Sequence, residues 1–316
     1  VLQRDCQYTI QEDSVDITQD ATLSIEPGVE IEVDSGLALT VSADGTISAQ
    51  GTEDNPIEIY GSSEQRGHWR GIEIQSDDPA NELSHVNVVH AGSNFAAIFM
   101  HRVDAAQATI RNCTVRASGS VGIAAERNGD IVDFRNNHIE NAQGPPMRIH
   151  PAQLRSLTGT TTFANNDESH VLVQPDMAYG GGTLTENGTW PALDLPYEIP
   201  GEIDIQSEIE INPGATFQFR KGGPIRLFVS QEGQLVADAS DGDPITFRGA
   251  EEAPGAWGGI FVRTETDNRF DNVVVRHGGG GYREANIGVG IDDPGSLTIR
   301  NSVVGDGASA GVLATN

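Results

Sequence analysis

The chain of 316 residues has almost no lysine: Lys221 is the only one, and arginine supplies the other basic residues. With 46 acidic and 19 basic residues, the formal net charge is −27 at pH 7. Such a surface repels nucleic acid and anionic membranes, and it disfavours polyanionic substrates. Two interpretations of the acidity stay open, a hydrated surface like that of proteins from salty environments and clusters of carboxylates that bind Ca²⁺.

Long apolar runs and cysteines are also scarce. No apolar stretch approaches the roughly 20 residues that span a bilayer, so membrane insertion is not expected. The first residues, VLQRDCQYTI, lack the basic-then-apolar pattern of an export signal, so any such signal is expected to have been removed. Cys6 and Cys113 are too few for a disulfide framework. Cys113 is expected to be a small core residue, and a Cys6–Cys113 bridge stays open for an exported protein.

Glycine and short strand-like segments are abundant. The chain has 37 glycines and 15 prolines, and its apolar residues alternate with polar ones over short stretches. A period of two is typical of strands with one buried face. Asn-Gly hairpin signals are rare, and Pro-Gly, Asp-Gly and Asn-Pro turns separate the segments instead. The pattern predicts short units that bury a core only by stacking on their neighbours, as in a solenoid.

The sequence also repeats itself. IEPGVEIEVDSG around Pro27 returns as INPGATFQFRKGG around Pro213, and SADGTISAQGTEDNPIEIYG returns as SQEGQLVADASDGDPITFRG. Trp69 and Trp257 lie 188 residues apart in the matching segments HWRGIEI and AWGGIFV, and His90 and His277 lie 187 apart. An offset this constant indicates an internal duplication. The shared residues are mostly those that a fold needs, so chemistry is expected more often among residues that are not shared.

The run PYEIPGEIDIQSEIEINPGATFQF, with GPIRLFVSQEGQLVADASDGDPITFRG and WGGIFV after it, resembles the right-handed parallel β-helix repeats of large bacterial surface and secreted proteins. Those proteins share the pectin-lyase-like fold. The resemblance implies an all-β, right-handed parallel β-helix, an internally duplicated solenoid. It implies little about function, because this fold carries lyases, hydrolases, adhesins and inert stalks.

The duplication predicts two regions. Residues 1–195 form the first β-helix copy with its additional coils, and residues 196–316 form a second, C-terminally incomplete copy. We expect one continuous stack with a seam near residues 188–200; two separate β-helices joined there are the alternative. Because the second copy is shorter, the chain is expected to be part of a longer array or to lack its last coils.

Four asparagines are expected to have a structural role. Asn112 and Asn301 occupy matching places, and Asn136 and Asn137 follow the same pattern. In parallel β-helices, asparagines at coil turns stack and share side-chain amide hydrogen bonds. We therefore predict an asparagine ladder rather than ligand-binding amides.

The duplicated tryptophans and histidines each permit two interpretations. An exposed Trp69 or Trp257 could stack on a sugar ring and so bind a ligand, but a retained Trp beside an inward strand favours packing at a coil corner. His90 and His277 could titrate or bind a metal. Since no second ligand stands at a recognisable spacing, we expect their side chains to hydrogen-bond a neighbouring carbonyl.

The unshared segment 129–196 is where an enzyme's catalytic residues are expected. Lyases of the resembling fold use Arg or Lys as a base, often with Ca²⁺, and its hydrolases use paired Asp carboxylates. Asp130, Asp133, Arg148 and His150 are the candidates for such groups on adjacent coils. None of the hydrolase patterns N-T-D, G-H-G or R-I-K is present, so no catalytic residue is assigned.

Two acidic pairs are candidate Ca²⁺ ligands. Asp77 and Asp78, and Asp292 and Asp293, precede turns, where aspartate also acts as a turn former. Both roles stay open, with the turn role first.

Two functional hypotheses follow. The first is a non-catalytic extracellular or cell-surface module for adhesion, display or glycan binding, with a polysaccharide or surface glycan as its partner. The second is a polysaccharide lyase or glycoside hydrolase. The low aromatic content of 6% argues against a long sugar-binding cleft, and we favour the first hypothesis.

Overall fold

The computed structural model describes residues 1–4, 6–101, 105–175, 182–221, 225–281 and 284–315. Nearly all regular structure is short parallel strands, which confirms the predicted all-β solenoid. The chain forms two compact units: unit 1 is Val1–Ile149 with Ser156–Val171, and unit 2 is His150–Arg155 with Leu172–Asn316. No helix in the described part of the chain is long and apolar enough to cross a membrane.

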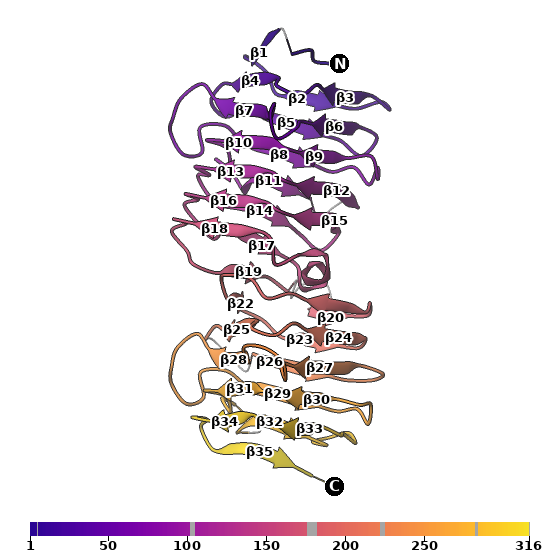
Figure 1. Cartoon of the computed structure of the whole chain (residues 1–316), viewed down its shortest axis with the longest axis vertical. Helices are drawn as coiled ribbons and strands as arrows, with labels where there is room; N and C mark the ends of the chain where they lie inside the picture. The colour runs from indigo at the N-terminus through magenta and orange to yellow at the C-terminus, as the bar shows by residue number, and fades with distance from the viewer. Residues whose placement is uncertain (5, 102–104, 176–181, 222–224, 282–283, 316) are drawn as a thin grey trace. The chain divides into compact units, whose positions relative to one another are not determined.

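Unit 1 consists of coils whose strands form three parallel sheets (Figure 1). The first sheet contains β1 (Gln7–Ile10), β4 (Glu30–Val33), β7 (Ile57–Gly61), β10 (Val86–Val89), β13 (Thr114–Arg116), β16 (His138–Glu140) and β18 (Thr162–Ala164). The second contains β2 (Val15–Ile17), β5 (Ala38–Val41), β8 (Gly71–Ile74), β11 (Ala96–Met100), β14 (Val121–Ala125) and β17 (Met147–Ile149). The third contains β3 (Thr22–Ile25), β6 (Thr46–Gln50), β9 (Glu82–Ser84), β12 (Ala106–Arg111) and β15 (Gly129–Arg135).

Unit 2 has the same three-sheet plan. Its first sheet, matched by the repeat to the first sheet of unit 1, contains β22 (Tyr197–Ile199), β25 (Thr216–Phe219), β28 (Ile245–Gly249), β31 (Val273–Arg276) and β34 (Val303–Gly305). The second contains β20 (Gly182–Leu184), β23 (Ile203–Ile205), β26 (Arg226–Val229), β29 (Gly259–Val262), β32 (Ala285–Val289) and β35 (Ala310–Ala314). The third contains β21 (Gly188–Trp190), β24 (Glu208–Ile211), β27 (Gln234–Asp238), β30 (Arg269–Asp271) and β33 (Thr298–Arg300).

The stretch before unit 2's repeated coils holds a short 3₁₀ helix, η1 (Pro151–Ser156), and strand β19 (Val171–Val173). Unit 2 begins before residue 196, where the second sequence copy is predicted to begin. The reason is that β20 and β21 pair in parallel register with β23 and β24 of the second copy. The region boundary at residues 195 and 196 therefore stays a prediction about the duplication, and the compact units divide earlier.

The turns between sheets explain the asparagines. Asn112 and Asn136, each between a third-sheet and a first-sheet strand, have φ values of 52° and 53°, and Asn301 has 47°. Asparagine tolerates this left-handed conformation better than other non-glycine residues, because its short side chain bonds locally. The Asn136 amide Nδ2–H donates to Asn112 Oδ1 at 3.1 Å. Asn301 Nδ2–H donates to Asp271 Oδ1 of the preceding coil at 2.8 Å.

A second, internal set of bonds involves Asn137, whose side chain is buried. Its Oδ1 accepts the backbone N–H of Cys113 at 3.0 Å, and its Nδ2–H donates to the carbonyl oxygen of Ile110 at 3.0 Å. Both groups belong to the preceding coil. The asparagines thus connect successive coils through side-chain amides, as the ladder prediction required.

The core of unit 1 is mainly aliphatic, whereas in unit 2 aromatic rings stack from coil to coil. Ring centroids are 5.1 Å apart for Tyr197 and Phe217, and 5.2 Å for Phe217 and Phe247. The Phe219 ring lies parallel to that of Trp257, with 4.0 Å between centroids. Rings at one register position of adjacent strands meet because the coil spacing is about 4.8 Å.

Candidate functional site

Three of the four residues of the catalytic hypothesis lie on two strands of unit 1. Asp130 and Asp133 stand on β15 of the third sheet, and Arg148 stands on β17 of the second. The Asp133 carboxylate is 3.2 Å from the Arg135 guanidinium, and Arg148 is 3.5 Å from the Glu126 carboxylate. His150 belongs to unit 2 and is buried. Asp133 and Arg148 are therefore engaged in ion pairs on separate sheets of unit 1.

The acidic pairs proposed for Ca²⁺ show the turn role at Asp78. Its Oδ1 accepts the backbone N–H of Ala80 at 2.9 Å, and its Oδ2 accepts the Thr46 hydroxyl. These bonds lower the pKa of Asp78, the Thr46 bond most. In unit 2, Asp292 lies 3.4 Å from Arg263 and has a φ of 76°.

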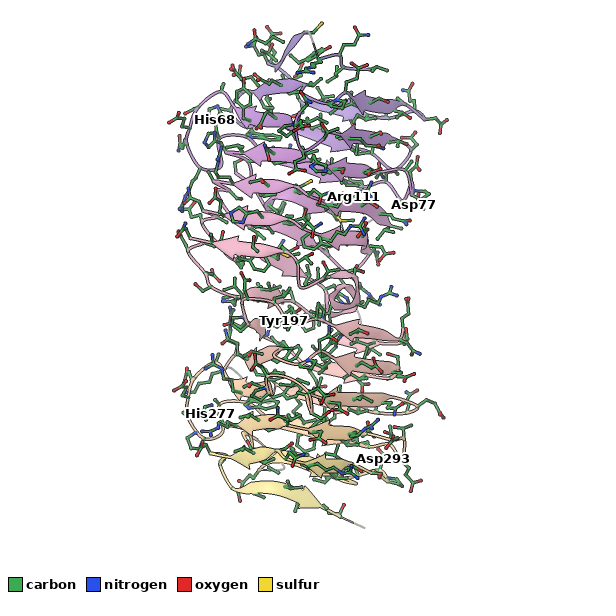
Figure 2. All side chains as sticks on the ribbon, viewed as in Figure 1. His68, Asp77, Arg111, Tyr197, His277 and Asp293 are labelled. Atoms are coloured by element: carbon green, nitrogen blue, oxygen red, sulfur yellow. The ribbon has the colours of Figure 1, made fainter. Side chains whose placement is uncertain are left out.

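Asp77 and Asp293 complete the two pairs, and Figure 2 shows both on the side of their unit away from His68 and His277. Within the described ranges, no three His, Cys, Asp or Glu side chains gather in an arrangement that could hold a metal ion. The calcium assignment stays a prediction.

The tryptophans are packing residues, so the interpretation that Trp69 and Trp257 bind a ligand is wrong. Both rings are fully buried, so neither has a face open to a sugar. Each indole N–H donates to a backbone carbonyl, that of Val89 at 2.9 Å for Trp69 and that of Arg276 at 2.8 Å for Trp257. Each ring therefore fixes a coil corner in its own unit.

The duplicated histidines occupy left-handed turns, with φ values of 61° at His90 and 64° at His277. The predicted side-chain bond to a neighbouring carbonyl is not made by Nδ1, since this atom is buried without a hydrogen-bond partner in both residues. At His90 the backbone N–H instead donates to the Arg116 carbonyl at 3.0 Å.

The cysteines do not form the bridge that the sequence left open. Cys6 is exposed and Cys113 is buried, and both thiols are free. The Cys113 thiol donates to the carbonyl oxygens of Arg111 and Leu83, at 3.2 and 3.3 Å. Burial raises the pKa of Cys113 to about 12, so this thiol is a core residue, as predicted.

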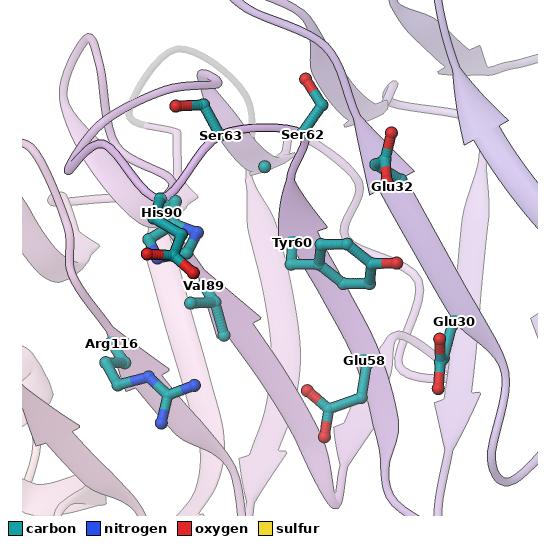
Figure 3. Close-up of a pocket in the computed structure, with 11 residues that line it drawn as sticks. Glu30, Glu32, Glu58, Tyr60, Ser62, Ser63, Val89, His90 and Arg116 are labelled. Carbon is teal, nitrogen blue, oxygen red and sulfur yellow. The ribbon is translucent and has the colours of Figure 1, made fainter.

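One surface cavity of unit 1 is a groove of about 410 Å³ on the outer side of the first sheet (Figure 3). Strands β4, β7, β10 and β13 form its floor, and the loop after β7 forms one wall. Its lining comprises Glu30, Glu32, Glu58, Tyr60, Gly61, Ser62, Ser63, Glu64, Val89, His90 and Arg116. We call this feature the acidic groove.

Parallel register assembles the acidic groove from short strands. Glu30 of β4 is directly opposite Glu58 of β7, and Glu32 is opposite Tyr60. Because side chains alternate across a strand, all four point to the outer face. Figure 3 shows the Tyr60 ring in the middle, with Glu30 and Glu32 on one side and His90 and Arg116 on the other.

The electrostatics of the acidic groove follow from that placement. Burial raises the pKa of Tyr60, and the charges of Glu30, Glu32 and Glu58 raise it further. The pKa of His90 is lowered by burial first and then by the Arg116 charge. The phenol is therefore held in its neutral form, and the His90 imidazole is biased towards its neutral form.

The carboxylates of the acidic groove have few partners. Glu58 Oε1 accepts the side-chain N–H of Asn87 at 2.5 Å. Glu30 and Glu32 form no ion pair with any cationic side chain that the structure describes. Their charges are left to act on the groove.

A second cavity, of about 470 Å³, adjoins the acidic groove. Glu12, Asp34, Ser35, Leu37, Ser62 and His68 line it, so Ser62 borders both cavities. The Ser62 Oγ is 3.0 Å from the Nε2 of His68. His68 lies on the loop at the edge of unit 1 in Figure 2.

The equivalent surface of unit 2 is built from different residues. The strand register places Gln218 at the position of Glu32, Thr246 at that of Glu58 and Arg248 at that of Tyr60. There Arg248 donates to Gln218 Oε1 at 3.3 Å and pairs with the Glu252 carboxylate at 3.3 Å. In unit 2, ion pairs therefore neutralise the surface whose counterpart in unit 1 carries unpaired carboxylates.

Residue-by-residue comparison of the two copies was the signal that could have found this groove. The groove residues occupy positions that both copies contain but fill differently, outside the unshared segment after residue 129 where catalytic residues were expected. Tyr60 and Arg248 are such a pair, as are Glu58 and Thr246. The groove's position on the first sheet also required the strand register, which composition does not give.

Comparison with known proteins gives one family match, of residues 1–97 to the family described as pectate-lyase-like beta helix domain. This segment includes all of the acidic groove except Arg116. No curated protein matches the chain. No solved structure matches it either. The family match over residues 1–97 and the stacked parallel strands agree with the resemblance drawn from the repeats, and together they support a pectin-lyase-like β-helix repeat protein.

Proposed function

We propose that this chain is an extracellular or cell-surface β-helix module that binds a glycan in the acidic groove without cutting the polymer. The observation that carries the proposal is the unneutralised register pair Glu30 and Glu58 beside Tyr60. Like charges directly opposite on neighbouring strands destabilise a sheet. The two carboxylates therefore lower the stability of the sheet, and a role in binding explains why they are present.

The size and lining of the acidic groove suit one or a few sugar units. Small-molecule sites typically occupy about 300–1,000 Å³ and combine an apolar surface with a few polar groups. Tyr60 supplies a ring that can stack on the apolar face of a sugar, and the carboxylates accept hydrogen bonds from its hydroxyls. The surrounding negative charge favours uncharged or amine-bearing glycans over uronates.

Binding is favoured over polymer cleavage because two of the catalytic candidates are already engaged in ion pairs. Asp133 and Arg148 are held in ion pairs on different sheets. The lyase or hydrolase alternative needs an acid, a base and a cation in one groove, and the acidic groove contains a single guanidinium, that of Arg116, within the described residues.

The test is binding to immobilised polysaccharides of three charge classes: neutral, amine-bearing and uronate. We expect retention on a neutral or amine-bearing polymer, with no change in polymer length. Tyr60→Ala should weaken that binding about tenfold, the loss of about 1.4 kcal/mol expected when an aromatic anchor is truncated. Arg248→Ala, at the matched position of unit 2, should leave it unchanged.

Three outcomes would contradict the proposal. Preferential retention on uronate polymers would show that the groove's charge does not select the ligand. Shortened or unsaturated products would establish the enzyme alternative. Equal loss in the Tyr60 and Arg248 variants would place the binding surface elsewhere.

A further inference from the structure

The junction between the two cavities of unit 1 holds a serine and a histidine in contact. Ser62 follows β7 directly and is exposed, and its Oγ lies 3.0 Å from His68 Nε2. This distance is within the range of an O–H···N hydrogen bond, with the imidazole as acceptor when its other nitrogen carries the proton. A hydroxyl nucleophile and its general base stand in the same relation in acyl-transfer sites.

The glycine before Ser62 makes the contact possible. A Cβ placed on Gly61 would lie 3.0 Å from the Cβ of His68 and 3.2 Å from that of His90. Any larger residue at position 61 would push the two histidines away from the strand end. The loop can therefore fold back closely enough for His68 to reach a residue only six positions earlier.

The second repeat preserves this backbone arrangement without the two reactive groups. A Cβ on Gly249 would lie 2.5 Å from the Cβ of Ala256 and 3.3 Å from that of His277, which mirrors Gly61 with His68 and His90. The position of Ser62 is filled by Ala250, and that of His68 by Ala256. The loop therefore keeps its fold in unit 2 without a serine–histidine hydrogen bond, and this bond is not a requirement of the turn.

Charged and polar groups surround the pair. Asp34 and Glu12 line the same cavity as His68, so this cavity carries negative charge. Within the described residues, the backbone N–H groups of Ser63 and Glu64 donate no hydrogen bond to the protein.

We propose that Ser62 and His68 form a nucleophile–base dyad that hydrolyses short acyl esters carried by uncharged sugars or other polyols. This activity goes beyond glycan binding, and a small ester is enough to test it. The negative charge of Glu12, Asp34 and the acidic groove selects against anionic esters.

The reaction needs only the ester and water. The Ser62 Oγ bonds to the acyl carbon as its proton moves to His68 Nε2, and the C–O bond to the alcohol breaks. The leaving alkoxide takes that proton and departs as an alcohol. Water then attacks the acyl-serine and gives a proton to His68, which returns it to Ser62 Oγ as the carboxylic acid leaves.

The test is covalent labelling with a fluorophosphonate, which a base-activated serine attacks with loss of fluoride. We expect mass spectrometry of the digested protein to find the phosphonyl group on Ser62. His68→Gln should slow labelling about 100-fold or more, the usual contribution of a general base. The control is Ser93→Ala, which removes an exposed hydroxyl of unit 1 that lines neither cavity and should leave the labelling rate unchanged.

Hydrolysis of p-nitrophenyl acetate gives the second readout, with Ser62→Ala expected to reduce it to the rate of the Ser62→Ala/His68→Gln double variant. Both positions are on the surface loop, and thermal unfolding will show that the variants remain folded. Absence of label from Ser62, or equal labelling of the wild type and the His68→Gln variant, would overturn the proposal. Neither outcome depends on whether a polysaccharide binds the acidic groove.

Discussion

Replacement of Asn137 by alanine is a direct test of the internal asparagine bonds. The side chain is 2% exposed and makes two hydrogen bonds to backbone groups of the preceding coil, at 3.0 Å each. Alanine would leave the N–H of Cys113 and the carbonyl of Ile110 without these partners. Both residues are at most 1% exposed, so water does not readily replace the lost amide.

The magnitude follows from the two orphaned groups. Each buried backbone group left unsatisfied costs about 1–3 kcal/mol. Asn137→Ala should therefore lower the free energy of unfolding by about 4 kcal/mol. Urea unfolding followed by circular dichroism measures this loss as a lower midpoint with an unchanged slope.

The control is Asn136→Gly, one residue earlier. Asn136 also bonds to the preceding coil, through Nδ2–H to Asn112 Oδ1, but this bond is exposed to water. Glycine keeps the left-handed backbone conformation, so the expected loss is below about 1 kcal/mol. A loss below about 1 kcal/mol for Asn137→Ala as well would refute the reasoning that buried amides connect the coils.

Two further predictions concern charge. Glu30→Thr introduces the residue that unit 2 has at the matched register position, and it should raise the urea midpoint because it relieves repulsion from Glu58. The expected gain in the free energy of unfolding is about 0.2–1 kcal/mol, and it should shrink at high salt. A lower midpoint would contradict the register argument. Asp78→Asn should lower the thermal midpoint at pH 7, because the Thr46 hydroxyl and the Ala80 N–H stabilise the carboxylate and lower its pKa. A depressed folded-state pKa gives stability that is present above the unfolded value of about 3.9 and is lost as the pH falls through the folded value, so the two proteins should converge in acid.

The sequence was sufficient to predict the fold because the determinants of a solenoid are local. Alternation over short segments predicted the strands, and the duplication predicted the same elements twice. Asparagines at the turns were recognisable because a left-handed conformation and a coil-to-coil amide bond both favour this residue. Asn112 and Asn136 illustrate both properties, with φ near 52° and a bond between them.

The candidate site was not predictable in the same way. Glu30, Glu58 and His90 lie on three different coils, and they share a groove only through the strand register. Burial was also decisive and invisible in the sequence. Trp69 is the kind of residue that stacks on sugars, but its side chain has no exposed surface. Tyr60, whose position in the second copy is filled by a non-aromatic residue, lines the groove.

The duplication turns unit 2 into an internal reference for unit 1. Gly61, Trp69 and His90 have the counterparts Gly249, Trp257 and His277, and in each unit these residues pack the corner of a coil. A backbone that folds with Ala250 and Ala256 does not require Ser62 and His68. A first sheet that tolerates Arg248 paired with Glu252 does not require unpaired carboxylates either. The fold therefore does not require the residues that distinguish unit 1. These residues border two adjoining cavities. Glu30 and Glu58 are like charges in register, and removing one of them would relieve repulsion in the sheet, so this pair is the place where the proposed glycan binding can be tested against stability.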